Sequence, residues 1–129
     1  MAIERERLRD LSRRVLRLHK VLLDRERRGY EARHGRIAPG TLFRLLLHDE
    51  QFVWLRSLSG MIAEIDALVD GEEEIADDDV QRVFREVYRL LKSGSSGTFH
   101  EKYVAALQDS PEVVMAHAEV SRVLGRDRA

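Results

Sequence analysis

The stretch Thr41–Asp70, TLFRLLLHDEQFVWLRSLSGMIAEIDALVD, decides the fold class of this chain. Its apolar residues cover most of the circumference of a helix instead of one stripe, which is typical of a helix packed on several sides by others. The run is interrupted at His48–Gln51, where Asp49 is suited to cap a new helix. We therefore expect a central apolar segment made of a short helix over 41–48 and a longer one over 50–69, with a kink near Asp49.

The residues before this segment predict a long basic first helix. Between Ile3 and His34 the chain has no proline and consists almost entirely of good helix formers, and Gly35 fits the left-handed position that ends a helix. Because sustained coiled coils need about three or four heptads, the short apolar seam favours packing inside the chain's own bundle, with a homodimer seam as the alternative. The seam residues are Leu8, Leu11, Val15, Leu18 and Leu22, and Leu16 and Leu23 widen it on one side.

Three further helices are predicted downstream. Acidic residues at 77–79 suit the first turn of a helix that ends before Ser93, and 93–98 has the composition of a loop. A shorter helix over 99–109 follows, and Ser110–Pro111 matches the start of a last helix. The apolar stripe expected on the first of these helices is Val80, Val83, Phe84, Val87, Tyr88 and Leu91, and that of the last is Val113, Ala116, Val120, Val123 and Leu124. The expected fold is all-α: a single-domain bundle of four to five helices over 1–129, frayed at about 1–4 and 125–129.

Composition limits the class of protein. Apolar residues make up 43% of the 129 residues and charged residues 35%, which supports a packed core under a strongly solvated surface. No uncharged run reaches the roughly 20 residues of a membrane span, and the N-terminus lacks the apolar run of a signal peptide, so we expect a cytoplasmic protein that does not bind membranes. The absence of cysteine excludes disulfides, thiol catalysis and thiolate metal sites.

Charge is distributed unevenly along the chain. Residues 1–36 hold eleven arginines and one lysine against six acidic residues, a net charge of +6, and the remainder carries −7. A basic face on the first helix could therefore bind a nucleic acid or another polyanion, although interspersed acids permit ion pairs along the same helix and the pI is about 6.5. The candidate basic face consists of Arg9, Arg13, Arg17, Arg27 and Arg28.

Polar side chains inside the central segment suggest a second kind of site. An arginine and a carboxylate between helices, with an indole wall beside them, would suit a small anion or carboxylate. The alternative is an edge of the helix that faces solvent. Serines in mid-helix lack the base and the oxyanion hole of a hydrolase, so no catalytic residues are assigned and an enzyme is disfavoured. The candidate ligand pocket consists of His48, Trp54, Arg56, Ser59 and Asp66.

Three histidines lie among apolar neighbours in predicted helices. Helical bundles build metal or haem sites from inward side chains on facing helices, which makes His19, His48 and His117 candidate metal ligands. The spacing that would define such a site is missing, because the chain has neither a His-Glu-x-x-His motif nor paired Glu-x-x-His motifs. Structural histidines are the favoured interpretation, and no cofactor is expected.

Three short runs, 18–24, 52–59 and 116–120, resemble those of a widespread group of small, functionally uncharacterised bacterial helical proteins. The resemblance implies a bacterial, helical, cytoplasmic protein and transfers no mechanism. The favoured function is a non-enzymatic bundle that binds a protein partner or a second copy of itself through the basic first helix or a face beside it. The alternatives are a small-ligand or metal-binding bundle and a polyanion-binding protein.

Overall fold

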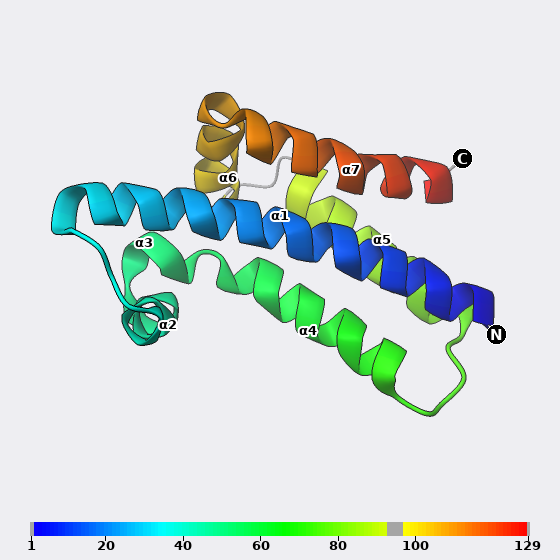
Figure 1. The fold of residues 1–129 in the computed structure, drawn as a ribbon. Coiled ribbons are helices and arrows are strands. Elements are labelled where there is room, and N and C mark those ends of the chain that lie inside the picture. Colours follow the sequence, from blue (N-terminus) through cyan, green and yellow to red (C-terminus); the bar gives the residue numbers. More distant parts are fainter. Residues whose placement is uncertain (1, 93–96, 129) are drawn as a thin grey trace.

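The computed structural model describes residues 2–92 and 97–128. These residues contain no strand, which confirms the all-α prediction, and none of their helices combines the length and apolar character that a membrane span requires. Within them lie seven helices, more than the predicted four to five (Figure 1): α1 (Ala2–His34), α2 (Pro39–His48), α3 (Glu50–Val53), α4 (Arg56–Asp70), α5 (Asp77–Lys92), α6 (Thr98–Asp109) and α7 (Pro111–Arg128).

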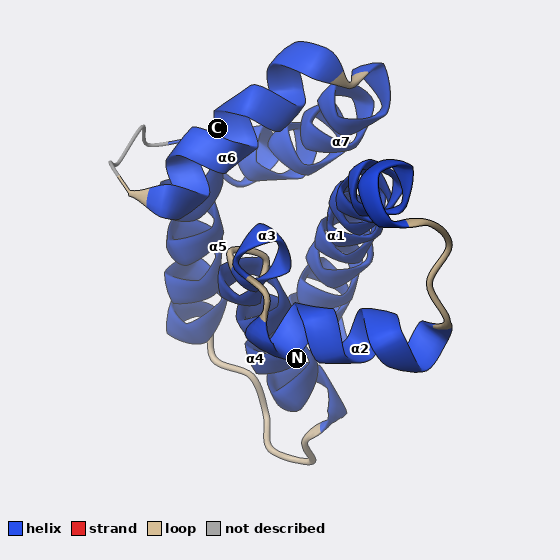
Figure 2. Cartoon of the chain, turned by 90° about the vertical axis from the view of Figure 1, so that its left-hand side faces the viewer, coloured by secondary structure: helices blue, strands red, loops and turns tan. Residues whose placement is uncertain are grey.

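The helix at the centre of the molecule is α1. It lies against α4 on one side and α7 on the other, and it also contacts α5 and α3 (Figures 1 and 2). The five predicted seam residues are fully buried within this single chain, whereas Leu16 is exposed. The expectation that the segment 41–70 would be the central helix is therefore wrong, because the regular seam of α1 gives it a buried face along most of its length.

The apolar segment is broken twice. Asp49 ends α2 and caps α3, its side chain accepting a hydrogen bond from the Gln51 backbone N–H at 2.8 Å, which confirms the predicted break. A second, unpredicted turn at Trp54–Leu55 separates α3 from α4 and buries both of its residues. Burial begins only at Phe52, so the N-terminal third of the segment does not belong to the core.

The later helices follow their predicted patterns. The α5 stripe is buried from Val80 to Leu91, and Ser110 caps α7 by accepting a hydrogen bond from the Val113 N–H at 3.3 Å. Residues 93–96 of the predicted loop lie outside the described residues. The inner stripe of α7 is buried as expected: Val113, Ala116, Val120, Val123 and Leu124.

The two ends of the molecule differ in charge. At one end the acidic α4–α5 loop lies beside the N-terminus of α1, where the Arg5 guanidinium donates to the backbone carbonyls of Gly71 at 3.2 Å and Glu73 at 2.9 Å. At the other end α1 terminates at Gly35, which has the expected positive φ of 85°, and the chain turns into α2 (Figure 1). This second end carries the exposed apolar side chains of α2 and charges of both signs.

Candidate interaction surfaces

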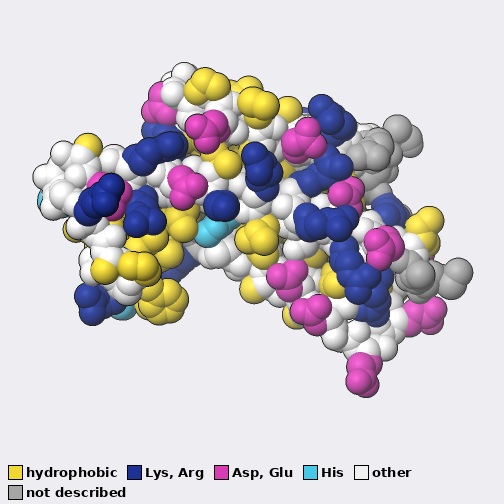
Figure 3. Space-filling model, in the orientation of Figure 1, with side chains coloured by type: hydrophobic (Ala, Val, Ile, Leu, Met, Phe, Trp, Pro, Cys, Tyr) yellow, Lys and Arg dark blue, Asp and Glu magenta, His cyan; other side chains and the backbone are white. Residues whose placement is uncertain are grey.

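The helix α2 places large apolar side chains on the surface. None of its ten residues, all of which the structure describes, is buried. Phe43 is 63% exposed and Leu47 39% exposed, and Leu42, Leu45 and Leu46 are half-buried. Figure 3 shows hydrophobic side chains gathered over α2 at the lower left of the molecule. An apolar helix at the surface is more informative than a single exposed leucine, since contiguous apolar patches mark interaction sites.

Specific contacts hold α2 in its helical form. A free helix of ten residues is marginal in water, because helices shorter than about 12–15 residues rarely form alone. Leu46 packs against the core, and the Arg56 guanidinium donates to the Leu47 carbonyl at 2.6 Å at the C-terminal end of the helix. The folded protein therefore presents α2 already formed, so a partner would not have to order it on binding.

Charges of both signs surround α2. Residues 32–48 include two histidines and the three arginines Arg33, Arg36 and Arg44, here called the basic border, and Glu31, Asp49 and Glu50 flank this range. The loop into α2 is fixed by Glu31, whose carboxylate accepts from the Ile37 N–H at 3.0 Å, and this hydrogen bond, aided by nearby arginines, lowers the pKa of Glu31. Arg44, His48 and Asp49 border a small hollow of about 290 Å³ on one flank of α2. The basic border of the apolar helix is thus interrupted by acidic residues at its C-terminal end.

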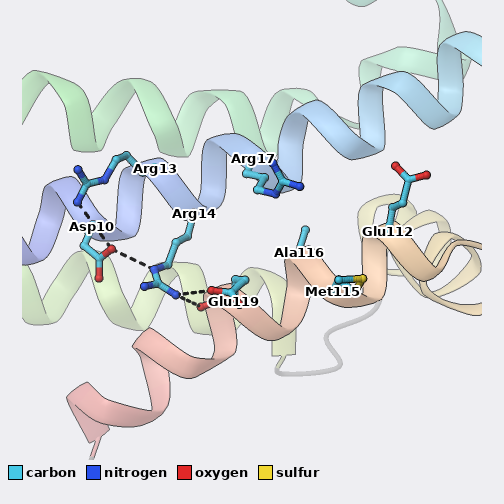
Figure 4. Close-up of a pocket in the computed structure, with 8 residues that line it drawn as sticks. All are labelled: Asp10, Arg13, Arg14, Arg17, Glu112, Met115, Ala116 and Glu119. Atoms are coloured by element: carbon cyan, nitrogen blue, oxygen red, sulfur yellow. Dashed lines mark hydrogen bonds and ion pairs between the residues drawn. The ribbon is translucent and has the colours of Figure 1, made fainter.

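A groove of about 570 Å³ lies between α1 and α7 (Figure 4). On one side of it, Arg14 joins the two helices by contacting Asp10 at 3.0 Å and Glu119 at 2.7 Å. Arg17 on α1 and Glu112 on α7 line the same groove, and neither makes an ion pair with any residue that the structure describes. The remaining lining residues are Arg13, Met115 and Ala116.

Two of the five residues of the predicted basic face, Arg13 and Arg17, line this groove. Much of the face is neutralised along α1, as ion pairing on one helix predicts: Arg9 contacts Glu6 at 2.7 Å, Arg13 contacts Asp10 at 3.9 Å, and Arg27 contacts Glu31 at 3.5 Å. Arg17 and Arg28 are exposed and make no ion pair with a described residue, so the face is only partly neutralised.

The five residues of the predicted ligand pocket are spread over α2, the α3–α4 turn and α4. Trp54 is buried, whereas His48 at the end of α2 and Arg56, Ser59 and Asp66 on α4 are exposed. Arg56 and Asp66 are ten residues apart on one helix, or about 15 Å, which is too far to share a small anion.

The polar contacts of these residues also lead in different directions. Arg56 bonds α2 through the Leu47 carbonyl, and the Ser59 hydroxyl donates to the Arg56 carbonyl at 3.3 Å. Asp66 instead accepts from the Ser12 hydroxyl of α1 at 2.7 Å. Arg56 and Asp66 therefore fasten α4 to two different helices, and the hydroxyl bond of Ser59 stays within α4.

Trp54 belongs to an aromatic cluster. Its ring lies 5.4 Å from Phe99, which stacks on Tyr103 at 5.4 Å, and the Tyr103 hydroxyl is hydrogen-bonded to His117 Nδ1 at 2.6 Å. Burial raises the pKa of Tyr103 and lowers the pKa of His117. The positive charge of Lys92 lowers the pKa of His117 further. The indole Nε1 of Trp54 is buried and has no hydrogen-bond partner among the described residues.

The three candidate metal ligands come from different helices. His19 lies half-buried on α1, where burial lowers its pKa, His48 is exposed on α2, and His117 is hydrogen-bonded to Tyr103 on α6. Within residues 2–92 and 97–128 no group of three or more histidine and acidic side chains is arranged to hold a metal ion. The three histidines therefore have separate surroundings and are not brought together at one site.

Sequence patterns left two features unnoticed. Glu26 is buried and is paired with Arg25 at 2.7 Å, and Arg25 also binds Asp109, which raises the pKa of the arginine and lowers that of Asp109. The outer face of α7 carries a second apolar stripe, which was visible in the spacing of Val114, Met115 and Ala118. A helix can thus carry a second apolar stripe besides the one that packs in the core.

Comparison with known proteins yields no relative: no family model, no curated protein and no solved structure matches the chain. The class of protein that the fold defines is a single helical bundle in which α1 is the central helix. Its two most distinctive surfaces are the apolar helix α2 with its basic border and the groove between α1 and α7.

Proposed function

We propose that the protein is a non-enzymatic interaction protein that inserts α2 into an apolar cleft with an acidic rim on another protein. The observation that carries the proposal is the exposure of α2, whose five large apolar side chains include none that is buried in this fully described helix. Phe43 and Leu47 are four residues apart, so they share one helical face, as anchor residues do when a helix binds in a groove.

The charge around α2 supports an acidic partner. The basic border would meet like charges in a basic partner and opposite charges in an acidic one, and complementary potentials steer association and exclude wrong partners. The convex shape of α2 also suits the inserting element better than the receiving cleft.

The expected contribution of the anchors is moderate. Fully burying a phenylalanine or a leucine is worth about 1.5–3 kcal/mol, and Phe43 still has 63% of its surface to lose. Replacing Phe43 by glutamate removes this burial and adds a charge that the acidic rim repels. The affinity for the partner should therefore fall by at least about tenfold.

A photo-crosslinking amino acid at position 43 tests the proposal in cells that produce the protein. Ile3 provides the matched control position, since it is 64% exposed, nearly the same as Phe43, and lies at the opposite end of α1. The captured protein is then purified and titrated with the wild type, Phe43→Glu and Ile3→Glu. We expect an adduct at position 43 with an acidic protein whose binding is lost in Phe43→Glu and kept in Ile3→Glu.

Three results would overturn the proposal: equal adducts at both positions, an adduct at position 43 only with a second copy of the chain, or equal affinity of both glutamate variants. A lipid surface is tested in parallel by sedimentation with vesicles containing about one-third phosphatidylserine, whose anionic headgroups attract basic segments. If the protein binds these vesicles and Phe43→Glu abolishes the binding, the partner of α2 would be a membrane and not a protein.

A further inference from the structure

The outer face of α7 carries a stripe that nothing in the chain covers within the described residues. A helix at the surface ordinarily has polar residues on its outward side. The outward positions of α7 are instead apolar or small over its first two turns, where Pro111, Val114, Met115 and Ala118 are exposed and recur at intervals of three and four, and the exposed Arg122 follows on the same face. Met115 is 70% exposed. This spacing is that of a helix face that packs against another helix.

The charges that border the stripe are arranged in a self-complementary order. Glu112 lies near the N-terminal end of α7 and Arg122 near its C-terminal part. Glu112 is without an ion pair among the described residues, and Arg122 contacts only the exposed Glu119 on its own helix, at 3.2 Å. Two copies of α7 aligned antiparallel about a point between Met115 and Ala118 would place Glu112 of each copy opposite Arg122 of the other.

We propose that this face is a homodimer interface in which α7 of a second copy packs antiparallel on α7 of the first. A two-fold interface requires each patch to complement itself, and the order of acid, apolar stripe and base along α7 does so. Glu112 and Met115 also line the mouth of the α1–α7 groove, so Arg122 of the second copy would enter the groove on reaching Glu112.

The interface is rigid on each copy. Arg14 ties α7 to α1 through its contacts with Asp10 and Glu119, and Ala116 on the inner side of α7 is buried. The inner stripe of α7 is packed in the core along its length. The outer face is therefore already in position for a second copy, with no rearrangement of the bundle.

The size of the face indicates a dimer that dissociates on dilution. α7 has 18 residues and is about 27 Å long, so a single helix pair buries less than the roughly 800 Å² per partner of a stable complex. The dimer would present two α2 helices in one assembly, which increases the avidity for a partner with two clefts. This inference stands on α7 and is independent of the function proposed for α2.

Sedimentation velocity over about 1–500 µM protein, a range that spans weak to moderate affinities, tests the interface. We expect the wild type to shift from monomer to dimer as its concentration rises, and Glu112→Arg and Arg122→Glu each to weaken the dimer by at least about tenfold. The variant with both changes restores opposite charges across the interface and should recover most of the association. A wild type that stays monomeric throughout, or single variants that dimerise as well as the wild type, would overturn the proposal.

A cysteine crosslink gives a second readout that does not depend on affinity. The chain has no cysteine, so Ala118→Cys introduces a single thiol near the proposed two-fold axis, and Leu16→Cys places one at an exposed site on α1 as the matched control. Mild oxidation should produce a covalent dimer from Ala118→Cys far faster than from Leu16→Cys, and Phe43→Glu in the same background should leave this result unchanged. Equal rates for the two cysteine variants would rule out the antiparallel α7 pair.

Discussion

The two helices α2 and α4 come from one continuous apolar segment, but α4 packs in the core and α2 lies at the surface. In α4, Leu58, Ile62, Ile65 and Val69 recur at intervals of three and four, and all four are buried. In α2, three leucines follow one another at 45–47, so the apolar side chains spread around the helix, and none of them, in this fully described element, is buried. Apolar content therefore predicts a helix in both cases, but only a narrow, regular stripe predicts the face that packs.

The comparison also explains why α2 lies at the surface of the bundle. The buried stripe of α4 packs on α1, which has a matching seam. In α2, Leu46 packs against the core and Arg56 ties the backbone, Leu42 and Leu45 are half-buried, and Phe43 and Leu47 are exposed. The exposed side chains can be changed at little cost to the stability of the bundle, as the docking role proposed for α2 requires.

The largest effect should come from Trp54, at the turn where the buried half of the segment begins. Trp54 is 5% exposed and packs on Phe99, so Trp54→Ala should lower the free energy of unfolding by about 3–5 kcal/mol in urea titrations. Trp54→Phe is the control, because it keeps an aromatic ring and removes the indole N–H that lacks a partner among the described residues. An unfolding midpoint that hardly moves in Trp54→Ala would contradict the buried position of the ring.

A matched pair of leucines tests the two halves of the segment directly. Leu58 on α4 is fully buried and Leu47 on α2 is 39% exposed. Leu58→Ala should cost about 2–5 kcal/mol of unfolding free energy, and Leu47→Ala less than about 1 kcal/mol. Equal losses in the two variants would show that both halves belong to the core.

The boundary between the halves depends on Asp49. Removing its side chain in Asp49→Ala leaves the Gln51 N–H without its acceptor, and loss of such a cap costs about 0.5–2 kcal/mol. Asp78→Ala, in the exposed first turn of α5, serves as the control and should cost less, since Asp78 there acts through the helix dipole alone. Chemical denaturation of both variants measures the difference. A smaller loss for Asp49→Ala than for Asp78→Ala would argue against the cap.

The smallest expected effect is a dependence of the free energy of unfolding on pH, which comes from two partly buried histidines. Burial lowers the pKa of His19 and His117 below 6.5, so the unfolded chain binds more protons than the folded one as the pH falls through this region. The free energy of unfolding should therefore decrease between about pH 7.5 and pH 5.5. His117→Gln retains an acceptor for the Tyr103 hydroxyl and does not titrate, so its decrease should be smaller; an unchanged slope would contradict the role given to His117.

Local signals made much of the fold predictable. The span of α1, the break at Asp49, the cap at Ser110 and the stripe of α5 all follow from interactions within a few residues, and each is present. The turn at Trp54–Leu55 was not predicted, because it contains neither glycine nor proline and is imposed by packing. The exposure of α2 was missed for a related reason: periodicity shows which side chains are apolar but not whether a neighbouring helix covers them.

The candidate sites, too, were predictable from the sequence only where local signals decide. The candidate arginines of the basic face all lie on α1, but only the structure shows that several are paired with acids on their own helix. For the polar residues of the segment 48–66 the sequence leaves open a pocket or a solvent-facing edge, and the helix rise places Arg56 and Asp66 about 15 Å apart. Convergence on a site is a tertiary property, so a list of suitable residue types could not establish it.

The measurement that tests the central claim most directly is the free energy of unfolding of Phe43→Glu. If α2 is an uncovered apolar helix kept for a partner, a charge at this 63% exposed position should change the stability by no more than about 0.5 kcal/mol, with the helical content unchanged. A loss of about 2 kcal/mol or more would show that Phe43 is buried in the folded protein, and the account of α2 as a docking helix would then be wrong.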